Sequence, residues 1–435
     1  MPLTRKDNVV NMPEKLAIDG GKPVRTTPFP TAKRWGAHPE FPGASIIGKE
    51  EEKAVVEVIR SQSLFRYYGS NLLNKVSQFE KEFENLMGIK HAQAVTSGTA
   101  ALNTGLAALG VGPGDEVIVP AYTFVASPEA VAAQKAIPVF AEIDYSLGLD
   151  PEDLKKKITK YTKAIMPVHL GGAPSKMDTI MEIAENHDLL VIEDCAQDIG
   201  GKYKGKRVGT IGDVGAFSLQ LHKNITTGDG GIVATDDDKI YERVARYQDH
   251  GNFRGKVGGG EDDEAFIGQV YRMNELTGAV ALEQLKKLDK IIELMKRPYF
   301  RIIKEIKDVH GLRMREIEDE SGISASDVTI FVEDPDKAER FSGALKAEGI
   351  PVGLRYQGKP VYALPQIMNM RTTTDVGCPW KCPLYKGKVK YKMGLCPKTE
   401  DIAKRTFNIG MNPLFTDQDA DDIIHAIKKV VENLL

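Results

Sequence analysis

Residues 213–236 read DVGAFSLQLHKNITTGDGGIVATD. This stretch contains two strand-like runs of apolar and small residues, Asp213–Leu219 and Gly230–Asp236. Between the runs is a polar, turn-rich loop that carries Lys223. Runs that are almost continuously apolar are typical of strands covered on both faces of a sheet. The stretch therefore predicts two buried strands with a lysine in the loop that joins them.

Runs of the same type recur upstream, and helix-like stretches lie between most of them. The other predicted strands are His91–Ser97, Glu116–Thr123, Pro138–Asp144, Lys163–His169 and Leu189–Ala196. The predicted helices among them are Thr99–Leu109, Ser127–Gln134 and Met177–Asn186. Strands that alternate with helices favour an α/β fold with a mostly parallel sheet, here of seven strands.

The C-terminal part of the chain has its own pattern. Met273–Ile306 predicts a long helix, which Arg297-Pro298 could break. A strand at Asp327–Val332 and helices at Asp336–Glu348 and Asp417–Leu434 follow, and Met370–Met393 has the composition of a long surface loop. We expect a large domain with the N-terminal segment at residues 1–285 and a smaller C-terminal α+β domain at residues 286–435.

Composition excludes several functional classes. The chain has 435 residues and a net charge of -3, which favours neither nucleic acid nor an anionic membrane as a partner. No apolar run reaches the roughly 18–20 residues of a spanning helix. Met1–Lys15 lacks the apolar core of a secretory signal, so we expect a cytoplasmic protein.

The four cysteines do not form a recognisable framework. Cys378 and Cys382 are separated by three residues, and Cys396 follows downstream, whereas Cys195 is distant. This spacing is not a standard zinc pattern. We expect reduced cysteines, three of them in a proline-containing loop, and no metal.

The acidic residue Asp194 lies at the end of the predicted strand that includes Val191. In open parallel sheets, ligands bind beyond the carboxyl ends of strands, and Ser97 and Ser218 also fall near such ends. A lysine and a strand-end aspartate in one cleft are what pyridoxal phosphate (PLP) chemistry needs. The lysine forms the internal aldimine, and the aspartate keeps the pyridine nitrogen protonated. Taken singly, Lys223 could be a solvated surface lysine, and Asp194 could cap a turn or a neighbouring helix.

A phosphate site is indicated by TSGTAA at residues 96–101, which joins a predicted strand to a predicted helix. Small residues let backbone N–H groups approach an anion, and the helix N-terminus adds partial positive charge. A well-capped helix start would have the same composition. The glycine cluster at residues 110–114 leads into a strand instead of a helix, which argues against NAD.

Several segments together resemble one family. They are SGTAAL at 97–102, GPGDEVIVP at 112–120, TFVAS at 123–127, EDCAQ at 193–197 and the lysine loop. In this order and spacing they are similar to the DegT/DnrJ/EryC1/StrS family of PLP-dependent sugar aminotransferases, which have fold type I (aspartate aminotransferase-like) architecture. The opening IDGGKPVR at 18–25 resembles the branch with inosose and aminohydroxybenzoate-pathway members.

The resemblance implies a role for each matching residue. Lys223 would form the Schiff base and shuttle a proton, and Asp194 would partner the pyridine nitrogen. Gln197 would lie near the ring hydroxyl, and Phe124 would stack on the ring, although a core phenylalanine is an alternative. Phosphate contacts would come from Gly98, Thr99 and Ser218.

The resemblance also implies the reaction. A side branch of the family has histidine at the lysine position and dehydrates sugars, so Lys223 favours transamination. His222, one place earlier, receives no role. A ping-pong reaction would move an amino group from L-glutamate or L-glutamine, through pyridoxamine phosphate, to a keto-sugar, free or nucleotide-linked, or a keto-cyclitol. The alternatives are a PLP-dependent dehydratase or other lyase, a PLP-binding regulatory protein and a nucleotide-binding protein that does not use PLP.

Family membership would place the site between the subunits of a homodimer. The family usually has Gly-x-Asn-x-Arg-Met in the segment that reaches the partner's cofactor. This chain has GQVYRM at residues 268–273, with Val270 in place of asparagine. Arg272 is therefore the candidate for a cofactor contact across the interface.

Overall fold

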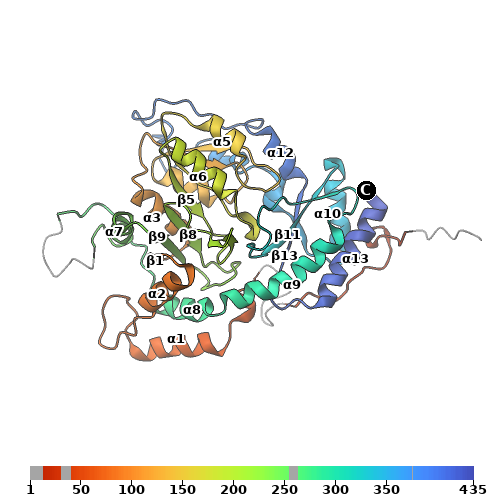
Figure 1. The fold of residues 1–435 in the computed structure, drawn as a ribbon, viewed down its shortest axis with the longest axis horizontal. Helices are drawn as coiled ribbons and strands as arrows, with labels where there is room; N and C mark the ends of the chain where they lie inside the picture. The colour runs from red at the N-terminus through yellow and green to blue at the C-terminus, as the bar shows by residue number, and fades with distance from the viewer. Residues whose placement is uncertain (1–12, 31–40, 254–262, 375) are drawn as a thin grey trace, which may run out of the picture.

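A seven-stranded sheet forms the centre of the larger part of the molecule (Figure 1). The computed structural model describes residues 13–30, 41–253, 263–374 and 376–435. The strand order is β1-β9-β8-β5-β4-β2-β3, and only β9 runs antiparallel to its neighbours. The strands are β1 His91–Val95, β2 Glu116–Pro120, β3 Ile137–Ala141, β4 Thr162–Ile165, β5 Leu190–Asp194, β8 Val214–Ser218 and β9 Gly231–Thr235. All seven predicted strands and their mostly parallel arrangement are confirmed.

Helices cover this sheet, and the three predicted ones are present within one residue of the expected bounds. They are α3 Gly98–Ala108, α4 Ala126–Ala133 and α6 Met177–Asn186. α3 is composed mainly of small residues and leucine, and most of it is buried, because it packs closely against β8 and β9. The remaining helices of this part are α1 Lys49–Ser61, α2 Lys75–Met87, α5 Pro151–Lys157, α7 Asp238–Tyr247 and α8 Glu275–Leu285.

A four-stranded antiparallel sheet forms the smaller part, in the order β10-β11-β13-β12. Its strands are β10 Leu312–Met314, β11 Asp327–Val332, β12 Val352–Leu354 and β13 Thr406–Gly410. The helices α9 Leu288–Ile306, α10 Ala338–Ala347 and α13 Asp417–Leu434 accompany it (Figure 1). The α+β character expected for the C-terminal part is confirmed.

The long predicted helix is divided, but not at its proline. α8 ends at Leu285 and α9 begins at Leu288, whereas Pro298 lies inside α9. The break occurs at Lys287, whose ammonium group binds both carboxylate oxygens of Glu51 at 2.7 and 2.9 Å. The expected break at Arg297-Pro298 is therefore wrong. The Lys287–Glu51 ion pair lies at this turn.

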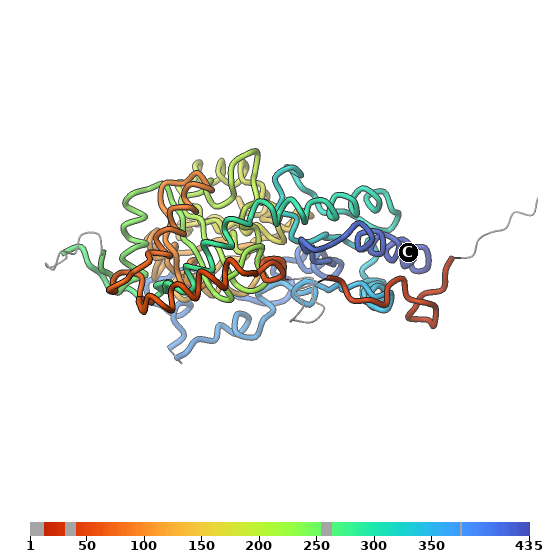
Figure 2. Tube along the Cα trace, turned by 90° about the horizontal axis from the view of Figure 1, so that it is seen from below, coloured from red at the N-terminus to blue at the C-terminus, as the bar shows by residue number. Residues whose placement is uncertain are grey.

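Two segments cross from one part of the molecule to the other. The N-terminal residues 13–30 pack on the smaller part, where the Ala17 N–H donates to Glu348 and Arg25 forms an ion pair with Asp419. Residues 361–374 and 376–396 lie against the large sheet, below it in Figure 2, and the hydroxyl of Tyr391 donates to the carbonyl of Pro138. The boundary at residue 285 stays a prediction. The chain crosses between the two parts of the molecule more than once, so a single sequence position does not separate them in space.

The short elements complete the description. They are β6 Lys202–Tyr203, β7 Lys206–Arg207, α11 Pro365–Met368, α12 Pro397–Lys404 and the 3-10 turns Ala17–Asp19, Ala44–Ile46, Leu170–Gly172, Pro335–Lys337, Arg355–Gly358 and Val361–Ala363. Over the described ranges, none of the helices combines the length and apolarity that crossing a membrane requires.

Candidate active site

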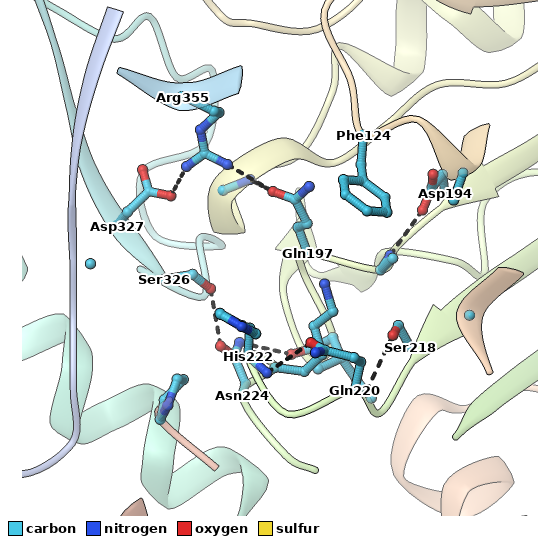
Figure 3. Close-up of a pocket in the computed structure, with 18 of the residues that line it drawn as sticks. Phe124, Asp194, Gln197, Ser218, Gln220, His222, Asn224, Ser326, Asp327 and Arg355 are labelled. Atoms are coloured by element: carbon cyan, nitrogen blue, oxygen red, sulfur yellow. Dashed lines mark hydrogen bonds and ion pairs between the residues drawn. The ribbon is translucent and has the colours of Figure 1, made fainter. Parts of the chain in front are cut away.

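A cavity of about 620 Å³ lies where the carboxyl ends of β5 and β8 face the smaller sheet (Figure 3). The large part of the molecule contributes one set of lining residues, which includes Ser97, Gly98, Thr99, Phe124, Asp194, Gln197, Ser218, His222 and Lys223. The smaller part contributes Asp327, Arg355, Tyr356 and Asn408. Every predicted site residue except Arg272 therefore borders one cavity.

Lys223 occupies the loop between β8 and β9. Its backbone is fixed from two sides, because its N–H donates to the Gln220 carbonyl and its own carbonyl accepts from the Gly43 N–H. Burial lowers the pKa of the Lys223 ammonium to about 8, although the nearby Asp194 carboxylate opposes this change. A lowered pKa makes the neutral amine, which is the nucleophilic form, accessible near neutral pH.

Asp194 is the last residue of β5 and is almost completely buried. One carboxylate oxygen accepts a hydrogen bond from the Ser127 hydroxyl at 2.8 Å, and the other accepts from the Ala196 N–H at 3.1 Å. Burial raises the pKa of this carboxyl above its ordinary value, and the hydrogen bonds and Lys223 offset part of that effect. A buried carboxylate of this kind is suited to hold a cation or a proton on a ligand.

The neighbouring Glu193 holds this end of β5 in place from the other face of the strand. Its carboxylate accepts from His169 at 2.9 Å and from the backbone N–H groups of Gly209, Ile211 and Gly212. Because the Ser175 N–H donates to His169 Nδ1, the proton of this imidazole is on Nε2 and is donated to Glu193. The cluster is internally satisfied and positions Asp194.

The N-terminus of α3 meets the end of β8 at the predicted phosphate site. The Ser97 hydroxyl caps α3 by accepting from the Ala100 N–H at 3.0 Å. A Cβ atom on Gly98 would lie 2.6 Å from Ser218 Cβ, so only glycine allows this approach. Thr99 is exposed toward the cavity beside them. The backbone N–H groups at the start of α3, the hydroxyls of Thr99 and Ser218 and the helix dipole thus lie at one end of the cavity. Phosphate binding requires groups of this kind.

Phe124 presents its ring to the cavity and is 55% exposed, which is unusual for a large aromatic residue. The core alternative is therefore excluded. Its ring centroid lies 6.5 Å from that of Tyr356. An exposed ring beside Asp194 offers a flat apolar surface on which an aromatic ligand can stack.

The smaller part supplies three cavity residues that the sequence did not indicate, Asp327, Arg355 and Tyr356. Gln197 Nε2 donates to the Tyr356 hydroxyl at 2.8 Å, and Arg355 Nη1 donates to Gln197 Oε1 at 2.8 Å. Arg355 also forms an ion pair with Asp327 (Figure 3). In addition, Ser127 was expected only as a helix start, whereas its hydroxyl holds Asp194.

Arg272 lies away from the cavity of its own chain. It forms an ion pair with the buried Asp249, and its guanidinium lies 5.2 Å from the ring centroid of Phe65. The expected contact with a partner's cofactor therefore stays a prediction. His222 borders the cavity mouth with its ring against Phe41, at a centroid distance of 4.6 Å.

The cysteines of the C-terminal loop are not gathered into one site. Cys396 is buried and its thiol donates to the Phe140 carbonyl, whereas Cys378 and Cys382 are partly exposed. All four cysteines of the chain are free thiols.

Comparison with known proteins identifies the arrangement. The model of the DegT/DnrJ/EryC1/StrS aminotransferase family matches residues 45–428. The chain belongs to this family. The match includes both parts of the molecule and all of the predicted site residues, so the family resemblance of the sequence motifs is confirmed.

Relatives and solved structures agree with the family over most of the chain. The spore coat polysaccharide biosynthesis protein SpsC of Bacillus subtilis is 34% identical over 89% of this chain and 96% of its own length. DesV of S. venezuelae, solved in complex with a ketimine intermediate, has a TM-score of 0.76 and 29% identity, covering 88% of this chain and 94% of DesV. An aminotransferase from Psychrobacter cryohalolentis has a TM-score of 0.78 and 27% identity, covering 94% and 100%.

Members of this aminotransferase family depend on PLP, and the cavity fits that cofactor. Lys223 can bind it covalently, and Asp194 can face its ring nitrogen. The close approach at Gly98 leaves an anion cradle for its phosphate, and Phe124 offers a stacking face. The enzyme is a PLP-dependent aminotransferase.

Proposed function

We propose that this enzyme transfers an amino group from L-glutamate or L-glutamine to the carbonyl carbon of a keto-sugar, free or nucleotide-linked, or of a keto-cyclitol. The observation that carries the proposal is the convergence of Lys223, Asp194 and the exposed Phe124 ring on one cavity. Relatives support the acceptor class. GDP-perosamine synthase of Vibrio cholerae is 42% identical over 50% of this chain and 59% of its own length. L-glutamine:2-deoxy-scyllo-inosose aminotransferase of Streptomyces lividus is 38% identical over 64% and 65%.

The residues divide the reaction among them. Bound PLP supplies an electron sink for the carbon that gains or loses the amino group. Asp194 holds the proton on the ring nitrogen. Lys223 Nζ would hold the cofactor covalently, and its amine, when free, would serve as the base that carries a proton between the reacting carbons. The burial that lowers the pKa of Lys223 increases the fraction of neutral amine, which is the basic form, near neutral pH.

The site is completed by a second copy of the chain in this proposal. Leu64, Tyr68 and Val270 are large apolar residues that are 46%, 67% and 46% exposed. They lie near one another, because Phe65 contacts both Tyr68 and Arg272. An exposed apolar cluster of this kind supports an interface, and closed twofold dimers are the commonest soluble assembly.

A substrate panel tests the function. Keto-sugars, nucleotide-linked keto-sugars and keto-cyclitols are incubated with glutamate or glutamine, and products are identified by mass spectrometry. We expect an amine that carries the donor nitrogen from one of these acceptor classes. Loss of water without gain of nitrogen would indicate a dehydratase instead.

The role of Lys223 is tested independently of the substrate. We predict that Lys223→Ala abolishes the absorption band of the Lys223–PLP Schiff base and all turnover while the fold remains intact, because the change removes the only covalent anchor of the cofactor. Lys359→Ala, at an exposed lysine outside the cavity, is the control. A PLP adduct that borohydride still traps in Lys223→Ala would contradict the assignment.

A further inference from the structure

The side-chain amide of Gln197 has only one orientation that its surroundings accept. Its oxygen accepts from the Gly171 N–H at 3.2 Å and from Arg355 Nη1 at 2.8 Å. Both partners are donors only, so a reversed amide would place N–H groups against N–H groups. The nitrogen therefore faces the Tyr356 hydroxyl, at 2.8 Å, and retains a second N–H on the cavity side.

Arg355 is itself held in place. Its Nη2 pairs with Asp327, and the exposed fractions of the two side chains are only 10% and 7%. Thr329 donates to the other oxygen of Asp327 at 2.6 Å, and the Tyr122 hydroxyl donates to the Arg355 carbonyl at 2.8 Å. Because the guanidinium is planar and forked, it can bind Asp327 with one arm and Gln197 with the other.

The backbone at Gly171 has no room for a side chain beside this pair. Gly171 has a φ of +59°, and a Cβ atom there would lie 2.6 Å from Asp327 Oδ2 and 3.0 Å from Arg355 Nη2. The glycine thus lets its own N–H reach Gln197 while the ion pair passes directly beside it. The orientation of the Gln197 amide is therefore set by residues from both parts of the molecule, namely Gly171, Asp327, Arg355 and Tyr356.

We propose that the Arg355–Asp327 pair is a positioning device, which fixes Gln197 so that its remaining N–H is donated to the phenolic oxygen of PLP. The inference rests on the proposed function, since it requires the cofactor in this cavity. Arg355 and Asp327 belong to the smaller part and Gln197 to the larger, so the contact also makes the environment of the cofactor depend on how the two parts pack.

The consequence can be measured without turnover. A hydrogen bond to the phenolic oxygen stabilises its negative charge in the form where the nitrogen that joins Lys223 to PLP has lost its proton. That bond therefore lowers the pH at which the nitrogen loses its proton and the near-visible absorption changes. Loss of the bond should raise this midpoint by about one pH unit.

The experiment uses the holoenzyme and a variant that removes both charges, Arg355→Met with Asp327→Asn. Pairing the substitutions matters, because Asp327 left alone would raise the midpoint through its charge. We expect the midpoint of the pair to rise by about one pH unit, as in Gln197→Leu. Combining all three substitutions should give no further rise, because residues that act through one another are not additive.

Two further variants make the result decisive. Arg355→Lys keeps the charge but loses the planar fork, so we expect a rise in the same direction from a minimally disturbed chain. Lys359→Met removes an exposed cation from the same segment and should leave the midpoint unchanged. Thermal unfolding of each variant establishes that it is folded.

The inference fails if the paired variant and Arg355→Lys both keep the wild-type midpoint, or if the rise adds fully to that of Gln197→Leu. An unmodified enzyme in which borohydride traps no PLP on Lys223 would instead contradict the proposed function. The two failures are therefore distinguishable.

Discussion

Lys223 combines a covalent role with an unusual acid–base environment. Burial lowers its pKa to about 8, from 10.5 for an ordinary lysine, so roughly a tenth of the amines are neutral at pH 7. We predict that the rate at which the cofactor-free enzyme captures PLP rises with pH through a midpoint of about 8. Stopped-flow absorbance over a pH series measures it. A midpoint near 10.5 would show that the amine is not desolvated before PLP binds.

Asp194 should matter for rate more than for binding. We predict that Asp194→Asn still binds PLP but slows the half-reaction with the amino donor at least about a hundredfold, because an amide cannot keep the ring nitrogen protonated. The asparagine can still accept from Ser127, so the local fold should persist. Single-turnover absorbance measures the rate, and a near-wild-type value would make Asp194 a structural residue.

The sequence predicted those cavity residues that have a recognisable pattern of neighbours along the chain. Asp194 ends a run of apolar residues, and Lys223 interrupts two such runs, so each has a local signal. Arg355 had none, because it meets Gln197 across 158 residues of chain. Tyr356 adopts a φ of +50°, a left-handed conformation that is uncommon for a bulky residue and is therefore not expected from the local sequence.

At the scale of elements, the junction of α3 with β8 can be tested with a matched pair of substitutions. Gly98→Ala would force Cβ to within 2.6 Å of Ser218, whereas a Cβ at Gly112 would meet nothing within 4 Å. We predict that Gly98→Ala weakens PLP binding about tenfold, roughly 1.4 kcal/mol, by displacing the anion cradle. Gly112→Ala should bind PLP normally. Equal affinities in an equilibrium titration would show that the cradle does not hold the phosphate.

The strands were easier to predict than the helix boundaries. Strands of a covered parallel sheet leave long apolar runs, and all seven were visible. Because proline disfavours helix interiors, Arg297-Pro298 was the possible break in a helix predicted over Met273–Ile306. In the molecule α9 contains Pro298, and the break lies beside Lys287, which contacts Glu51, a residue distant in the sequence. A tertiary ion pair of this kind leaves no periodic signal.

For the whole molecule we predict a homodimer in which Arg272 serves the partner's site. Chains with Lys223→Ala are mixed with chains carrying Arg272→Gln and Asp249→Asn, a pair that removes both charges of the Arg272–Asp249 ion pair together. In each mixed dimer, one site would keep both functional residues, so activity should return. Sedimentation reports the assembly. An active monomer would refute the dimer, and an intact dimer without complementation would refute only the role of Arg272.

The repeated crossing of the chain between the two parts limits how the enzyme can be recombined. Residues 13–30 pack with α13 and the Glu348 turn, whereas residues 361–374 and 376–396 pack on the large sheet although β12 and β13 flank them in the sequence. A chimera made by one splice near residue 285 would therefore contain two mismatched interfaces. One would lie between residues 13–30 and the smaller part, and the other between the segment after β12 and the large sheet. To exchange the smaller part with that of a relative, residues 13–30 would have to travel with it and residues 361–396 would have to stay behind.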